Sequence, residues 1–309
     1  MEKILNSFKF LYAGEDTVKK HLLLALLFLL PSFATVCFQA VDKDEKAMII
    51  PLLIAGGIFL VLSILPMIML CGIFVKFLNR KFLGQNGIPE INMDILVQGA
   101  KVLPVYLVWG IYIGLPVLIY LMAVFGGFTY ILTLDVGLLF QILFFFIMFG
   151  LVFLLAIPLF IITPFITMIY IKYATNLQYS SEIFNPLTPF RYMKIAFKDA
   201  LLVALKYFVV SIGVSFVSQI IGLLLGVLLC IFVFIGAFIS SFIASGAQVD
   251  WILYIPMLIG FALYMVINSY AVQIVNFAYA NNLADIYKEK VEPLDTKSES
   301  YIQMEDAEL

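Results

Sequence analysis

The sequence predicts an all-α integral membrane protein in which six transmembrane helices form three hairpins that each leave the cytoplasm and return to it. Two observations support this prediction. Hydrophobic residues make up 64% of the 309 residues and charged residues only 12%, whereas a soluble domain carries roughly a quarter charged residues. The lysines and arginines are also sorted along the chain, with long apolar stretches between their clusters.

The basic residues indicate which ends of the predicted helices are cytoplasmic. Cytoplasmic loops of inner-membrane proteins retain lysine and arginine, so four cytoplasmic regions, both termini included, follow from the clusters. Only Lys43 and Lys46 lie elsewhere, in a turn with three acidic residues. The four clusters are Lys3, Lys9, Lys19 and Lys20; Lys76, Arg80, Lys81 and Lys101; Lys172, Arg191, Lys194, Lys198 and Lys206; and Lys288, Lys290 and Lys297.

The apolar stretches are long enough for helices that cross a bilayer. A hydrocarbon core about 30 Å thick requires roughly 20 apolar residues of helix, and a helix satisfies all its backbone hydrogen bonds within the segment. The predicted spans are residues 22–41, 48–75, 102–125, 137–171, 200–235 and 251–280.

The fifth apolar stretch, residues 200–247, admits two interpretations. One straight helix of that length would measure about 70 Å, whereas two spans would place Lys288 and Lys290 outside the cytoplasm. Residues 236–250 also resemble residues 126–137, the predicted outer loop of the preceding hairpin, because both segments begin with small residues and end near an acidic one. We therefore expect one span followed by an outer loop over 236–250.

With this choice the chain divides into three similar hairpin units, residues 1–80, 88–178 and 187–287. Each unit begins with a short amphipathic stretch of the kind that lies in the headgroup plane of a membrane. In the third unit Thr188 is a predicted N-cap and Pro189 suits the first helical position. Basic residues beside its apolar stripe predict contacts with anionic lipid: Arg191, Lys194 and Lys198.

The three returning helices end alike, with aromatic residues just before asparagine in residues 74–82, 170–178 and 277–285. One interpretation is a true internal repeat, which would relate the hairpins by an axis along the membrane normal. The other is that cytoplasmic helix ends share this composition, because aromatic rings favour the interface. Residues 288–309 are polar and acidic, and we expect a disordered cytoplasmic tail.

The segment from Gly72 to Lys101 resembles an uncharacterised family of bacterial and archaeal polytopic membrane proteins, a domain of unknown function. The shared pattern is a Gly-aromatic helix end, an arginine turn, Gly, Pro-Glu and a Gly-Lys approach to the next span. The resemblance implies a polytopic membrane fold, and it transfers no enzyme activity because none is established for the family. The matching residues are Gly72, Phe74, Arg80, Gly84, Pro89, Glu90, Gly99 and Lys101.

Five polar residues within the apolar stretches are candidate interior contacts. Amides at lipid depth usually join neighbouring helices, although the alternative is a polar path between the hairpins. Lys206 lies close enough to a helix end for its ammonium group to reach the lipid headgroups, and a buried contact inside the protein is the alternative. These residues are Lys206, Gln141, Gln219, Asn268 and Gln273.

The sequence contains no motif for catalysis, and we expect neither enzyme activity nor a cofactor. His21 is the only histidine, so the multi-histidine metal sites are excluded, and we expect it to be a solvated residue at the membrane interface. The expected partners are membrane lipids and other membrane proteins such as transporter subunits, with no nucleic acid. The predicted role is a scaffold or accessory subunit of the inner membrane, and the alternative is a transporter, channel or lipid-handling protein.

Overall fold

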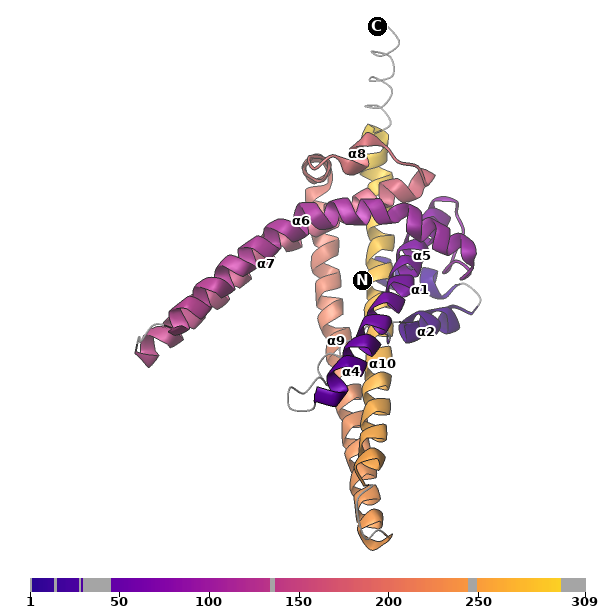
Figure 1. Ribbon diagram of the computed structural model, residues 1–309. Coiled ribbons are helices and arrows are strands. Elements are labelled where there is room, and N and C mark those ends of the chain that lie inside the picture. The colour runs from indigo at the N-terminus through magenta and orange to yellow at the C-terminus, as the bar shows by residue number, and fades with distance from the viewer. Residues whose placement is uncertain are drawn as a thin grey trace, which may run out of the picture. The chain divides into compact units, whose positions relative to one another are not determined.

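The structure, a computed structural model, describes residues 2–13, 16–27, 29, 46–133, 137–243 and 249–295 (Figure 1). All regular structure in these residues is helical. The elements are α1 (Glu2–Tyr12), α2 (Thr17–Leu27), α4 (Lys46–Leu62), α5 (Ile64–Phe82), α6 (Met93–Thr133), α7 (Leu138–Asn176), α8 (Ser181–Phe184), α9 (Thr188–Ile243), α10 (Val249–Ile286) and the π-helical turn η1 (Tyr287–Val291).

The prediction of an all-α membrane protein is confirmed at this level. Within the described part of the chain, five helical segments are long and apolar enough to cross a membrane, which indicates a multi-pass membrane protein. The first predicted span, 22–41, lies mostly outside the described residues and stays a prediction. The five segments are Leu53–Phe82, Met93–Gly127, Leu139–Asn176, Thr188–Leu228 and Ile259–Asp295.

The two predicted outer loops are largely helical. α6 continues through Gly126 and Gly127 to Thr133, and α9 continues to Ile243. Small residues do not by themselves end a helix, and in apolar surroundings a continued helix keeps every backbone group hydrogen-bonded. The prediction of loops over 126–137 and 236–250 was therefore wrong for most of their length.

The long apolar stretch after residue 200 is one helix as far as Ile243, so no break divides it into two helices within these residues. How many times residues 200–247 cross the membrane stays a prediction. The predicted amphipathic stretch before it is also present. Ala196 has a non-helical backbone (φ −124°, ψ 19°) and separates residues 188–195 from the rest of α9. In the predicted hairpin unit 88–178, by contrast, the amphipathic stretch is continuous with α6, which begins at Met93. The preceding residue, Asn92, accepts a hydrogen bond from the Ile95 amide through Oδ1 at 3.2 Å.

The chain forms two compact units. Unit 1 comprises Met1–Phe74, Asn86–Leu96 and Lys206–Tyr279. In it, α9 and α10 are antiparallel neighbours: Ser218 Oγ donates to Asn268 Oδ1 at 3.3 Å. A side chain at Gly222 would come within 2.4 Å of the Tyr264 ring, so this glycine permits the close approach of the two helices.

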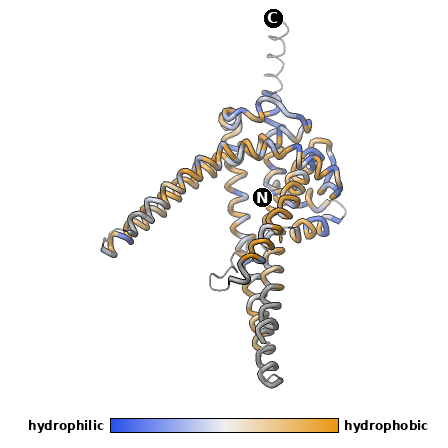
Figure 2. Tube along the Cα trace, in the orientation of Figure 1, coloured by the Kyte–Doolittle hydropathy of each residue, from blue (hydrophilic) through white to orange (hydrophobic). Residues whose placement is uncertain are grey.

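Unit 2 comprises Val75–Gln85, Val97–Leu205 and Ala280–Leu309, of which the residues through 295 are described. In it, α6 and α7 run side by side (Figure 1), and the Tyr120 hydroxyl donates to the Leu151 carbonyl at 2.8 Å. Hydrophobic residues dominate these two helices, whereas hydrophilic residues gather around α8 and the C-terminal turns (Figure 2).

The similar ends of the three returning helices meet in unit 2. The Asn79 amide, on α5, donates to the carbonyls of Ala174 and Thr175 at 2.8 and 3.3 Å, and these carbonyls belong to the last turn of α7. Lys81 forms an ion pair with Asp285 of α10 at 2.7 Å. The Asn79 amide therefore satisfies two carbonyls that the end of α7 leaves without intrahelical partners.

The predicted disordered tail, residues 288–309, is ordered over its first residues. Residues 287–291 form the π-helical turn η1, and residues 292–295 are helical. Val291 and Asp295 are both buried. The expectation of disorder was wrong for residues 288–295, because burial of these side chains offsets the cost of ordering the turn. Residues 296–309 lie outside the described residues.

Candidate functional site

Four charged side chains form an alternating cluster at the ends of the helices in unit 2. Lys172 pairs with Glu182 and also lies 3.3 Å from Asp295. Arg191 donates through Nη1 to Glu182 and through Nη2 to Asp295, each at 2.6 Å. Each base therefore contacts both acids, and the formal charges cancel. We call Lys172, Glu182, Arg191 and Asp295 the four-charge cluster.

The local structure explains why these side chains meet. Lys172 lies near the C-terminal end of α7, and the turn after α7 leads into the short helix α8, which carries Glu182. Two hydrogen bonds hold α8 in place: Thr188 Oγ1 donates to the Glu182 carbonyl at 2.7 Å, and Trp109 Nε1 donates to the Ile183 carbonyl at 2.8 Å. Arg191 follows in the first turns of α9.

Asp295 is the most highly coordinated member of the cluster. Its side chain is only 7% exposed. Besides the two bases, it accepts hydrogen bonds from the hydroxyls of Tyr192 at 2.8 Å and Tyr287 at 3.2 Å. Four donors around one carboxylate form a socket for an anion. We call Lys172, Arg191, Tyr192 and Tyr287 the anion socket.

The bases also control the ionisation of Glu182, which lies on α8 outside the candidate spans. Burial by itself would raise the pKa of Glu182, but the hydrogen bonds from Arg191 and Lys172 outweigh it and leave the pKa below its ordinary value. Glu182 is consequently ionised at neutral pH, as the alternating arrangement requires.

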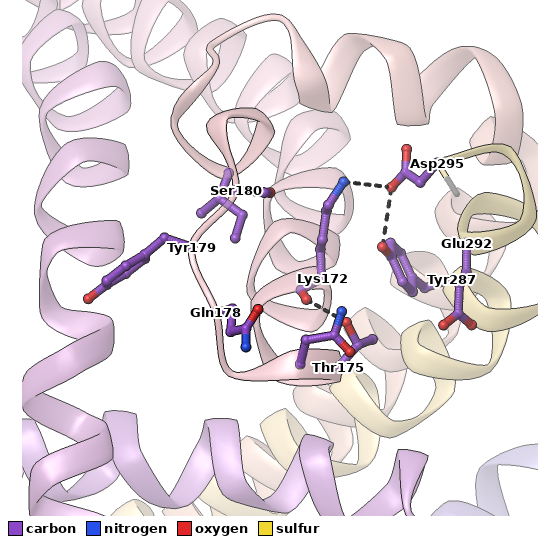
Figure 3. A pocket seen from close by; sticks show the side chains of 10 residues that line it. Lys172, Thr175, Gln178, Tyr179, Ser180, Tyr287, Glu292 and Asp295 are labelled. Atoms are coloured by element: carbon purple, nitrogen blue, oxygen red, sulfur yellow. Dashed lines mark hydrogen bonds and ion pairs between the residues drawn. The ribbon is translucent and has the colours of Figure 1, made fainter. Parts of the chain in front are cut away.

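A cavity of about 330 Å³ opens beside the cluster (Figure 3). Lys172 and Asp295 lie on facing walls and are joined across it. The hydroxyl of Ser180, which also lines the cavity, is buried and has no hydrogen-bond partner within the described part of the chain. The lining residues are Lys172, Thr175, Asn176, Gln178, Tyr179, Ser180, Ile183, Tyr287, Glu292 and Asp295.

This arrangement is suited to binding a small polar group. Among the described residues no set of three histidine, cysteine, aspartate or glutamate side chains is placed to hold a metal ion. The donors of the cavity are a lysine, hydroxyls and amides, which recognise anionic and polar groups.

The five predicted interior contacts do not form one site. Gln141 belongs to unit 2 and the other four to unit 1. Lys206 and Gln219 are exposed, as is typical of lipid-facing or interfacial positions. Asn268 bonds Ser218, as expected for a contact that joins helices, and Gln273 is buried beside His21.

The predicted lipid-contacting stripe is divided by the structure. Lys194 and Lys198 are exposed, whereas Arg191 is engaged by two acids of the four-charge cluster. Arg191 therefore has a role within the protein that the sequence pattern did not reveal. Helical periodicity placed all three on adjoining positions but gave no information about Glu182 and Asp295.

His21 was expected to be solvated, but it is fully buried in unit 1. Its ring packs edge-on against Tyr270 and Phe277, with centroids 5.6 and 5.7 Å apart. Burial lowers the pKa of His21 to about 4, and the neighbouring Gln273 amide offsets part of that effect. His21 is thus neutral at pH 7, packed as an aromatic residue.

The chain matches no protein-family model, and the comparisons found no matching curated protein or solved structure. The resemblance of Gly72–Lys101 to a domain of unknown function stays a prediction.

Proposed function

We propose that this chain is a non-enzymatic membrane scaffold or accessory subunit that contacts lipid and other membrane proteins through the apolar faces of its long helices. The observation that supports the proposal is the distribution of burial. Buried side chains gather at the helix ends of unit 2, whereas from residue 110 to residue 163 only Val124 and Met148 are buried among the residues whose side chains are described.

The distal halves of α6 and α7 consequently present large apolar side chains outward. Phe146, Phe149 and Phe153 of α7 are 65%, 58% and 64% exposed. Lipid tails cover such faces, and so do helices of partner proteins, which associate by packing rather than by hydrophobic burial. A scaffold needs apolar helix faces that point outward, on helices whose other ends are fixed by packing within the protein.

The alternative, a conduit between the hairpins, receives less support. The cavity beside the four-charge cluster is polar, but none of the five predicted interior residues lines it. A second, shallow hollow is lined only by α9 residues that include Leu223, Val227 and Phe234, and all its lining residues are apolar apart from Gly226 and Cys230.

A photo-crosslinking side chain at position 153 tests the scaffold role. In native membranes we expect a discrete protein adduct from position 153, weakened by Phe149→Ala on the same face, and none from the buried position 165. The purified chain in lipid alone should give lipid adducts only. Lipid adducts alone in native membranes, together with solute flux through proteoliposomes of the purified chain, would instead establish the conduit.

We also propose the finer topology: six spans in three hairpins, an inner-membrane location and both termini in the cytoplasm. The sorting of lysine and arginine supports it. Single cysteines at positions 43, 135 and 250 of a cysteine-free chain should react with an impermeant thiol reagent on intact cells, and a cysteine at 290 should be protected. Labelling of position 290 from outside would reject six spans.

A further inference from the structure

The anion socket is filled by the chain's own C-terminal segment. Residues 288–295 follow Tyr287 through the rest of η1 and the helical residues 292–295, and we call them the strap; Tyr287 itself remains part of the anion socket. The strap is anchored by the Asp295 carboxylate and by the buried side chain of Val291. It begins with a π-helical turn, an uncommon geometry that occurs frequently at functional sites.

The two acids that line the cavity, Glu292 and Asp295, both belong to the strap. The other wall, from Lys172 to Ile183, contributes only neutral residues and a lysine. With the strap in place, Lys172 and Arg191 are balanced by Glu182 and Asp295. Without the strap, two bases would face Glu182 alone, and the site would carry a net charge of +1.

We propose that the anion socket and its cavity form a binding site for a phosphate group, and that the strap blocks this site by seating Asp295 where the phosphate would bind. A guanidinium fork, a lysine ammonium and a phenolic hydroxyl are donors typical of phosphate recognition. The buried Ser180 hydroxyl, which has no partner in the described part of the chain, supplies a further donor on the same cavity.

The strap and the phosphate compete for the same donors, so each disfavours the other. The apparent affinity for phosphate is the intrinsic affinity multiplied by the fraction of molecules in which the strap is released. A lipid headgroup and a free phosphate share this chemistry. The inference does not depend on the scaffold role, because a blocked phosphate site would serve a transporter subunit equally well.

The test uses the full chain in nanodiscs of zwitterionic lipid, titrated with inorganic phosphate in a calorimeter. We expect Asp295→Asn to bind phosphate about tenfold or more tightly than the wild-type chain, because the variant weakens the strap and leaves the socket positively charged. Adding Lys172→Gln should abolish the gain. Asp285→Asn is the matched control, since it makes the same charge change on α10 away from the socket.

A second measurement follows the strap with Asp295 in place, on a cysteine-free chain that carries single cysteines at the two labelled positions. Spin labels at the exposed positions 178 and 294 should give one narrow distance distribution, and phosphate should add a longer distance. A titration with short-chain phosphatidate in place of inorganic phosphate distinguishes the source: tighter binding of the lipid identifies a headgroup, and equal or weaker binding identifies free phosphate.

Three outcomes would overturn the proposal: no phosphate binding by a folded Asp295→Asn variant, equal binding by the Asp285→Asn control, or a distance distribution that phosphate does not change. None of these outcomes affects the crosslinks expected from position 153, so the two proposals fail separately.

Discussion

The guanidinium of Arg191 lies 2.6 Å from the carboxylate of Asp295, although the two residues are 104 positions apart in the chain. The contact joins the beginning of α9 to the segment that follows α10. Arg191 was predicted to face lipid and Asp295 to lie in a disordered tail, but in the structure both belong to one ion-paired site.

Removal of one member of the four-charge cluster should lower the stability of the folded chain substantially. Lys172→Met leaves Glu182 and Asp295, 14% and 7% exposed, with Arg191 as their only base in the cluster. We expect a loss of about 3 kcal/mol, because an uncompensated buried charge is costly. Thermal unfolding of the purified chain measures it. Lys194→Met, the same change at an exposed position, should alter stability little.

The single histidine should make stability depend on pH. The folded-state pKa of His21 is about 4 and its unfolded value about 6.5, so the unfolded state binds more protons between these values and acidification favours unfolding. We expect a loss of roughly 2 kcal/mol between pH 7 and pH 5. Melting temperatures across this range should fall in the wild-type chain and stay nearly level in His21→Phe. Parallel curves for both proteins would contradict a buried neutral histidine.

Trp109 should report on the attachment of α8. Its indole N–H donates to the buried Ile183 carbonyl at 2.8 Å, and the side chain is 3% exposed. Trp109→Phe leaves that carbonyl without this donor, and we expect a cost of about 1–3 kcal/mol. In a Trp251→Phe background, Trp109 should emit at short wavelength and resist quenching by iodide. Ready quenching would show that α8 does not cover the ring.

The exposed lysines of α9 should bind anionic lipid without Arg191. We expect Lys194→Gln with Lys198→Gln to weaken binding of phosphatidylglycerol by about 1 kcal/mol for each charge. Native mass spectrometry of lipid retained from mixed nanodiscs measures this. Arg191→Gln should instead lower the melting temperature and leave lipid retention unchanged, and an equal loss of lipid would place its guanidinium at the membrane.

The fold was predictable where one physical requirement dominates. Long apolar stretches have to be helical in a bilayer, so the helices were predicted, and the absence of strong breakers kept residues 200–243 in one helix. The outer loops were predicted too long because Gly126 and Gly127 were interpreted as a turn, although a helix accommodates glycine at a cost of only about 1 kcal/mol.

The candidate site was only half predictable. Lys172 and Arg191 belong to a recognised basic cluster, but Glu182 and Asp295 carried no signal, since single acids in polar segments are common. His21 was misjudged for a related reason: its position beside two lysines suggested solvent, and only the packing of Tyr270 and Phe277 around it shows burial.

The sequence by itself determined that this chain is helical and built for a membrane, because hydropathy and charge act on each segment separately and can be evaluated along the chain. Only the tertiary structure decided which charges meet, which amides are buried and where the C-terminal segment is anchored. These properties depend on pairs of residues from different helices. A carboxylate such as Asp295 becomes part of a site only when folding brings the opposite charges within hydrogen-bond distance and removes the water around them.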